Sequence, residues 1–139
     1  MRRFFVVAML VFASPSVAAA GEANDGNHFL VFFDSGKADI SKDSAATLDG
    51  VIAAYREAGA VTISLSGYSD RFGPSVENYR VSTMRAASVR DYLARHGVPE
   101  RSISVEAHGE ANPLVETANG VMEPQNRRVE IVIGPGSTP

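Results

Sequence analysis

The chain has 139 residues, of which 13 are basic and 16 are acidic, and it contains no cysteine. This length suits one domain with a single core, and the acidic balance argues against nucleic acid as a partner. The absence of cysteine excludes a disulfide framework, thiolate catalysis and a lipidated cysteine after a leader.

The first 20 residues have the pattern of a secretory signal peptide. Arg2 and Arg3 precede an apolar run, and small residues follow it up to Ala20. The apolar run from Phe4 to Ala13 is shorter than a transmembrane helix requires. We therefore expect export and a mature chain that starts near Gly21. The expected divisions are a flexible lead-in over residues 21–27, one domain over 28–134 and a flexible tail over 135–139.

The residues that follow alternate between strand and helix patterns. The apolar run HFLVFF at 28–33 predicts a strand, and helical spacing begins at Ser41 and stops at Gly59. Apolar residues alternate with Thr and Ser over 61–66, which predicts a strand with one buried face. A second helix is expected with Pro74 in its first turn and Gly97 after its end.

Two further strands complete the expected fold. In RSISVEAHG the residues Ile103, Val105 and Ala107 alternate as inward positions, and NRRVEIVI alternates again after a polar connection that contains a loop or a short helix. This order predicts an α/β sandwich of the βαβαββ type, in which a mixed four-stranded sheet carries its helices on one face.

An arginine interrupts the apolar face of the second predicted helix. Val81, Arg85 and Val89 follow one another at four-residue spacing, so Arg85 faces the core, where a guanidinium is costly unless an anion meets it. Asp70 is the nearest anion along the chain, and Arg127 begins the last strand on its buried side. If the three converge, they suit the carboxylate and ammonium groups of a zwitterionic amino-acid end. The alternative is a structural ion pair between Arg85 and Asp70.

Other kinds of chemistry find little support in the sequence. GYSDR lacks the final glycine of a hydrolase nucleophile elbow, and the three histidines are too widely separated for a zinc site. DSGKADISKD lacks the carboxylate spacing of a calcium loop and predicts a turn and helix cap, with Asp39 or Ser41 as the capping residue. We therefore expect no enzyme activity, no metal and no cofactor.

The chain resembles the OmpA-like C-terminal domain, which binds peptidoglycan non-covalently in Gram-negative envelopes and is shared with Pal-type and MotB-type proteins. The linked motifs run from FFDSGKADI through GYSDRFGPSVENYRVSTMRAASVRDYL and HGVPERSISVEAHGEANP to EPQNRRVEI. The resemblance implies a non-catalytic periplasmic protein, associated with the outer membrane or cell wall, that binds the diaminopimelate-containing peptide stem. The alternative is a module that keeps this fold but binds another envelope protein.

The same resemblance implies roles for particular residues. Asp70 and Arg85 match the residues that hold the amino and carboxylate groups of diaminopimelate. Supporting positions fall on Asn78, Ser69 and Arg127.

The chain departs from the family pattern at four positions. Tyr68 replaces the usual histidine, Ser69 the usual threonine and Val81 the usual leucine. Gly36 replaces a larger polar residue that often reaches the ligand, so a contact there is expected from the backbone or from Asp34.

Overall fold

The computed structural model describes residues 27–59 and 61–135. The predicted signal peptide, most of the lead-in and most of the tail therefore lie outside the described residues.

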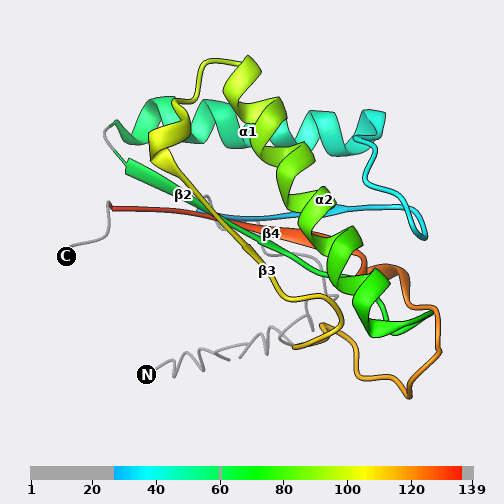
Figure 1. Ribbon diagram of the computed structural model, residues 1–139. Coiled ribbons are helices and arrows are strands. Elements are labelled where there is room, and N and C mark those ends of the chain that lie inside the picture. The colour runs from blue at the N-terminus through cyan, green and yellow to red at the C-terminus, as the bar shows by residue number, and fades with distance from the viewer. Residues whose placement is uncertain (1–26, 60, 136–139) are drawn as a thin grey trace, which may run out of the picture.

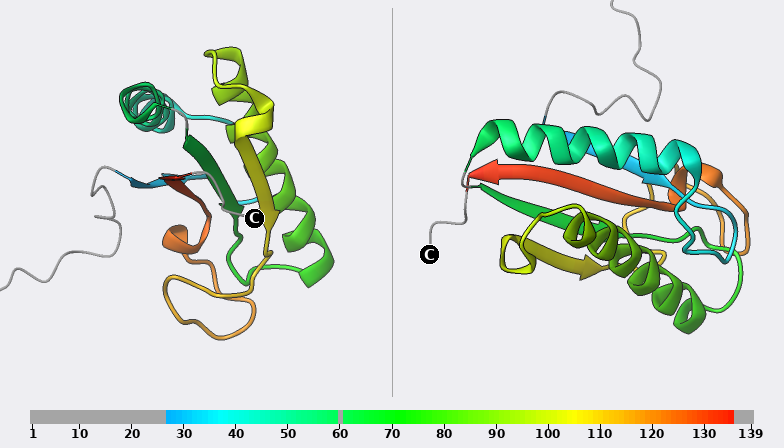
Figure 2. Two further views of the ribbon diagram at one scale, coloured as in Figure 1. Left: turned by 90° about the vertical axis from the view of Figure 1, so that its left-hand side faces the viewer. Right: turned by 90° about the horizontal axis from the view of Figure 1, so that it is seen from above.

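The described residues form four strands and two α-helices. The strands form one mixed sheet, and both helices lie on the same side of it (Figures 1 and 2). Strand β2 is parallel to β3, and β4 is antiparallel to both β1 and β2. The sheet order is β1-β4-β2-β3, which confirms the expected α/β fold. The elements in chain order are β1 (His28–Phe32), α1 (Lys42–Ala58), β2 (Val61–Gly67), α2 (Ser75–Arg95), the 3-10 turn η1 (Glu100–Ser102), β3 (Ile103–Ala107), the 3-10 turn η2 (Pro124–Asn126) and β4 (Arg128–Pro135).

The helix ends follow the capping signals with one small shift. Ser41 is the residue that caps α1, and its hydroxyl accepts a hydrogen bond from the Ser44 amide at 3.1 Å. Gly59 ends α1 with a φ of 82°, a conformation that glycine adopts without a steric penalty. Pro74 stands at the N-cap of α2 instead of within its first turn.

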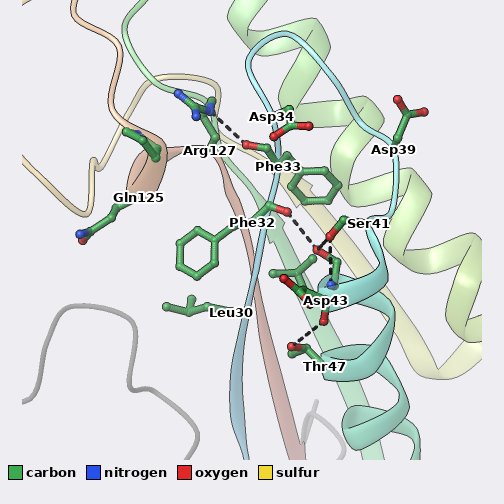
Figure 3. A pocket seen from close by; sticks show the side chains of 13 residues that line it. Leu30, Phe32, Phe33, Asp34, Asp39, Ser41, Asp43, Thr47, Gln125 and Arg127 are labelled. Carbon is green, nitrogen blue, oxygen red and sulfur yellow. Dashed lines mark hydrogen bonds between the residues drawn. The ribbon is translucent and has the colours of Figure 1, made fainter.

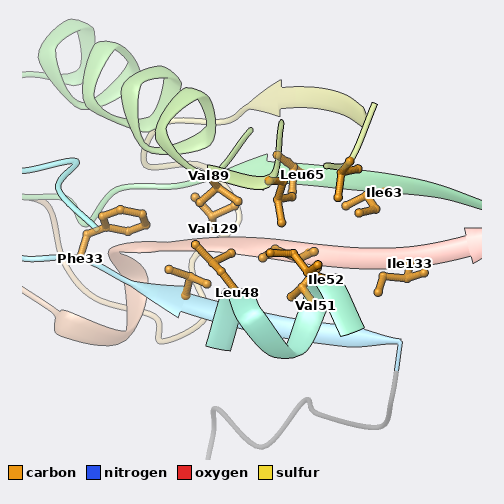
Figure 4. Close-up of a cluster of buried hydrophobic side chains, with 13 residues drawn as sticks. Phe33, Leu48, Val51, Ile52, Ile63, Leu65, Val89, Val129 and Ile133 are labelled. Carbon is orange, nitrogen blue, oxygen red and sulfur yellow. The ribbon is translucent and has the colours of Figure 1, made fainter. Parts of the chain in front are cut away.

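A core of aliphatic side chains lies between the sheet and the two helices (Figure 4). Burial of each such side chain contributes about 1.5–3 kcal/mol, so this layer fixes how both helices lie on the sheet. Its buried aliphatic members are Val31, Ile63, Leu65, Val129, Ile131 and Ile133 from the strands and Leu48, Val51, Ile52, Val89 and Leu93 from the helices.

Two expectations about the last strands were wrong. Val105 shares the register position of the buried Leu65, yet it is 37% exposed because β3 lies at the edge of the sheet and has a neighbouring strand on one side only. Arg127 does not begin the last strand, because β4 starts one residue later at Arg128.

The contact between β2 and α2 gives a test of this packing. A Cβ at Gly67 would lie 2.2 Å from the backbone oxygen of Ser82, so Gly67→Ala forces α2 away from the end of β2. We expect this variant to lose at least about 2 kcal/mol of unfolding free energy. Gly134→Ala is the matched control, since no atom lies within 4 Å of a Cβ there. Urea unfolding of both variants measures the difference, and equal stabilities would contradict the packing.

Candidate functional site

A small pocket lies where β2 runs into the N-terminal half of α2. Its volume is about 240 Å³, which suits the end group of a side chain better than a whole drug-sized molecule. Three segments form its walls: the loop after β1, the loop after β2 and the inward face of α2. Four of the six predicted site residues line this pocket, namely Ser69, Asp70, Asn78 and Arg85.

The guanidinium of Arg85 is held by backbone carbonyl groups. Its Nε donates to the carbonyl of Lys37 at 2.8 Å, its Nη1 to that of Tyr68 at 3.0 Å and its Nη2 to that of Asp34 at 2.9 Å. Arg85 is 1% exposed, and no ion pair joins it to Asp70 among the described residues. The alternative prediction of a structural ion pair between Arg85 and Asp70 was therefore wrong.

The positive charge of Arg85 is buried away from solvent. Burial lowers its pKa to about 10, although the negative charge of Asp70 acts in the opposite direction and Arg127 adds to the decrease. The side chain is still protonated at neutral pH, and the ring of Phe33 lies 5.5 Å from its central carbon. The pocket thus contains a cation that no carboxylate contacts directly.

Asp70 supplies the negative charge of the site and pairs with Arg127. Its Oδ2 accepts from Nη1 of Arg127 at 3.2 Å and from the Glu123 amide at 3.2 Å, while Oδ1 accepts from the Phe72 amide at 3.3 Å. Asp70 is 5% exposed. An ionised carboxylate offers about four acceptor positions, so these three bonds orient Asp70 and leave it capacity for one more donor.

Asn78 and Ser69 line the same pocket as the two charges, and hydrogen bonds fix both side chains. The amide nitrogen of Asn78 donates to Glu110 at 3.0 Å and to the Gly73 carbonyl at 3.3 Å. Its Oδ1 has no hydrogen bond to another described residue, so it remains an acceptor for a ligand. The hydroxyl of Ser69 donates to the carbonyl of Asp70 at 2.9 Å and fixes the turn that carries this carboxylate.

The other two predicted residues line a different pocket. Asp34 and Arg127 line a second, larger pocket of about 540 Å³ near the start of α1 (Figure 3). Asp34 contributes its carbonyl to Arg85, while its side chain is exposed. Arg127 also donates through Nε to the Phe33 carbonyl at 3.0 Å, so it orients Asp70 from the end of β1.

A stacked group on the opposite face of the sheet was missed by the sequence reasoning. Arg128 shares the outward phase of the last strand with Glu130, but it is 2% exposed and its central guanidinium carbon lies 3.9 Å from the centre of the Tyr68 ring. His108 stacks on the same ring at 4.9 Å, and burial and then Glu130 raise the pKa of Tyr68. The Tyr68 side chain therefore packs away from the pocket, and only its carbonyl accepts a hydrogen bond from Arg85. No local signal in the sequence reveals the loop whose Asn112 carbonyl accepts a hydrogen bond from Arg128.

The fold and the pocket define a small α/β domain with a buried pair of opposite charges where a strand leads into a helix. The described residues contain no group of three side chains placed to hold a metal ion. Within the same part of the chain, neither helix combines the length and the apolar character that crossing a membrane requires.

Comparison with known sequences identifies the family. The sequence profile of the OmpA family matches residues 32–127. An outer membrane protein of Gluconacetobacter diazotrophicus is 37% identical over 111 residues, which are 76% of this chain and 29% of that protein. A peptidoglycan-associated lipoprotein of Rhizobium meliloti is 33% identical over 107 residues, which are 75% of this chain and 59% of that protein.

The solved structures agree with this assignment. The crystal structure of a peptidoglycan-associated lipoprotein from Burkholderia pseudomallei matches 76% of this chain and 89% of that one, with a TM-score of 0.69 and 24% identity. At this identity the likeness shows the fold. The chain belongs to the OmpA family, and it spans less than two thirds of the length of the two curated relatives.

The contacts of Arg85 predict its effect on stability. Arg85→Lys retains a positive charge but loses the planar fork that reaches three carbonyl groups in different directions. We expect a loss of about 2–4 kcal/mol in unfolding free energy, because buried carbonyls are left unpaired. Arg90→Lys on the exposed side of α2 should change it by less than about 0.5 kcal/mol. Thermal unfolding measures the stability of the two variants. An Arg85→Lys variant as stable as the wild type would argue against a stabilising role for the three hydrogen bonds from Arg85 to backbone carbonyls.

Proposed function

We propose that this protein binds peptidoglycan without cleaving it and that the pocket takes the zwitterionic end of diaminopimelate in the peptide stem. The observation that carries the proposal is a protonated Arg85 and an oriented Asp70 lining one pocket without contacting each other. The names of the relatives, an outer membrane protein and peptidoglycan-associated lipoproteins, support it. The function also fits the predicted export to the periplasm.

The two charges match the two ends of an α-amino acid group. Arg85 has five N–H donors and uses three of them on carbonyls, so N–H groups remain for a ligand carboxylate. Asp70 and the Oδ1 of Asn78 are acceptors for an ammonium group. This division of donors and acceptors supports a ligand that carries both charges.

The remaining walls suit the carbon chain that bears such a group. Phe72, Pro74 and Val81 line the same pocket and provide apolar surface for methylene groups. A further carboxylate at the pocket, that of Glu77, is half exposed and pairs with Arg80. Glu77 therefore adds negative charge near the surface of the pocket. The buried Asp70 is the carboxylate that is oriented to accept hydrogen bonds from an ammonium group.

Co-sedimentation with diaminopimelate-type sacculi tests the function. The wild type should pellet with sacculi, and Asp70→Asn should bind at least about tenfold more weakly, because the ammonium loses its charged partner. Asp91→Asn removes the same charge from an exposed position on α2 and should bind like the wild type. Circular dichroism must first show that each variant is folded. If the wild type fails to pellet, or if Asp70→Asn pellets equally well, the proposed function is wrong.

Gly36 gives a second test because it lies in the wall of the pocket. Its φ is 67°, and no atom lies within 4 Å of a Cβ built there. Asparagine tolerates this backbone conformation, so we expect Gly36→Asn to fold and to bind sacculi more tightly through its added amide. Gly36→Val tests the backbone argument, since a β-branched residue should lose at least about 1 kcal/mol of stability there. Unchanged binding by a folded Gly36→Asn would place the stem away from this loop.

A further inference from the structure

The larger pocket, lined by β1, the first turn of α1 and η2, plays no part in the proposed function. Its lining is mainly apolar on the strand side and carboxylate-rich on the helix side. Figure 3 shows Leu30 and Phe32 extending to one side of β1, with Asp43 and Thr47 on α1 at the other. The pocket therefore follows the outer edge of β1.

The hydrogen-bond pattern leaves part of this edge unpaired. β1 is the first strand in the sheet order and pairs with β4 alone. The Phe33 amide donates to the Arg127 carbonyl, and the Ile133 amide donates to the Asn27 carbonyl. Because hydrogen-bonded and non-hydrogen-bonded pairs alternate along antiparallel strands, the odd-numbered residues of β1 form the hydrogen bonds to β4. The amide and carbonyl groups of Leu30 and Phe32 consequently point to the open edge.

One of these outward groups already has a partner. The carbonyl of Phe32 accepts a hydrogen bond from the Ser44 hydroxyl at 3.0 Å. The Leu30 amide and carbonyl and the Phe32 amide have none with another described residue. An exposed row of this kind is a template for an added strand.

The side chains around the edge indicate what such a strand would carry. Phe32 is 37% exposed, and Leu30 beside it is partly exposed, so the surface accepts apolar side chains. Asp34, Asp39 and Asp43 are exposed carboxylates in the lining, which favour basic side chains. Gln125 adds a buried Oε1 that has no hydrogen-bond partner among the described residues.

We propose that the edge of β1 binds an extended segment of a partner protein in which apolar and basic residues alternate. Pairing with a second copy of this chain would bring a second set of the same three aspartates to the interface, which like-charge repulsion opposes. The lead-in residues GEANDG contain two acids and no base, so they do not match the carboxylate rim either. The tests of this proposal rest on Leu30, Phe32, Asp39 and Asp43, none of which lines the pocket of Asp70 and Arg85, so its outcome is independent of the proposed function.

An NMR titration with a designed peptide tests the proposal. The chain without its predicted signal peptide, labelled with ¹⁵N, is titrated with acetyl-Lys-Val-Lys-Val-Lys-Val-amide. We expect saturable shifts of the Leu30 and Phe32 amides and none in β3, the other edge of the sheet. The matched peptide with glutamate in place of lysine should bind at least threefold more weakly, and so should the lysine peptide methylated at every backbone nitrogen.

A variant links the effect to the carboxylates. Asp39→Asn combined with Asp43→Asn should weaken binding of the lysine peptide at least threefold, whereas Asp91→Asn on α2 should leave it unchanged. The proposal is overturned if Leu30 and Phe32 do not shift, if the glutamate peptide binds equally well, or if shifts occur only around Asp70. Concentration-dependent shifts of the same amides without peptide would instead identify a second copy as the occupant.

Discussion

The structure depends on one buried guanidinium. Arg85 projects from α2 and donates to carbonyls of the loop after β1 and of the residue after β2, so three segments that are distant in sequence meet at one side chain. Its burial lowers its pKa and costs solvation free energy, which the three hydrogen bonds offset in part. Because these bonds are made to the backbone, the cation is fixed without being neutralised by a neighbouring carboxylate.

The same arrangement keeps the two opposite charges of the proposed binding site apart. Asp70 is oriented from the opposite side by Arg127 and by the amides of Phe72 and Glu123, and these contacts hold it away from a direct ion pair with Arg85. Preorganised groups lose little freedom on binding, which favours affinity for a small end group. Removal of Arg85 itself affects folding and binding together, so Asp70 is the more informative position for binding tests.

The sequence predicts the scaffold and the inward arginine because both depend on local periodicity. Four-residue spacing along α2 places Arg85 correctly, and alternation along β2 places Leu65 in the core. It does not predict which partner each charge has, since the bond between Arg127 and Asp70 depends on how η2 turns before β4. Arg128 shows the same limit: its outward position in the strand pattern indicates solvent, whereas Tyr68 and a distant loop bury it.

The central claim is that Arg85 and Asp70 together bind a zwitterion, and a pair of stem peptides tests it most directly. One tripeptide, L-Ala-γ-D-Glu-meso-diaminopimelate, ends in a side chain with both an ammonium and a carboxylate, and its lysine analogue keeps the ammonium alone. The account predicts that the first peptide binds at least tenfold more tightly than the second, as measured from the NMR shifts of the Arg85 Nε–H group and the Asp70 amide. Equal affinities of the two peptides, or binding that shifts neither of these two signals, would contradict it.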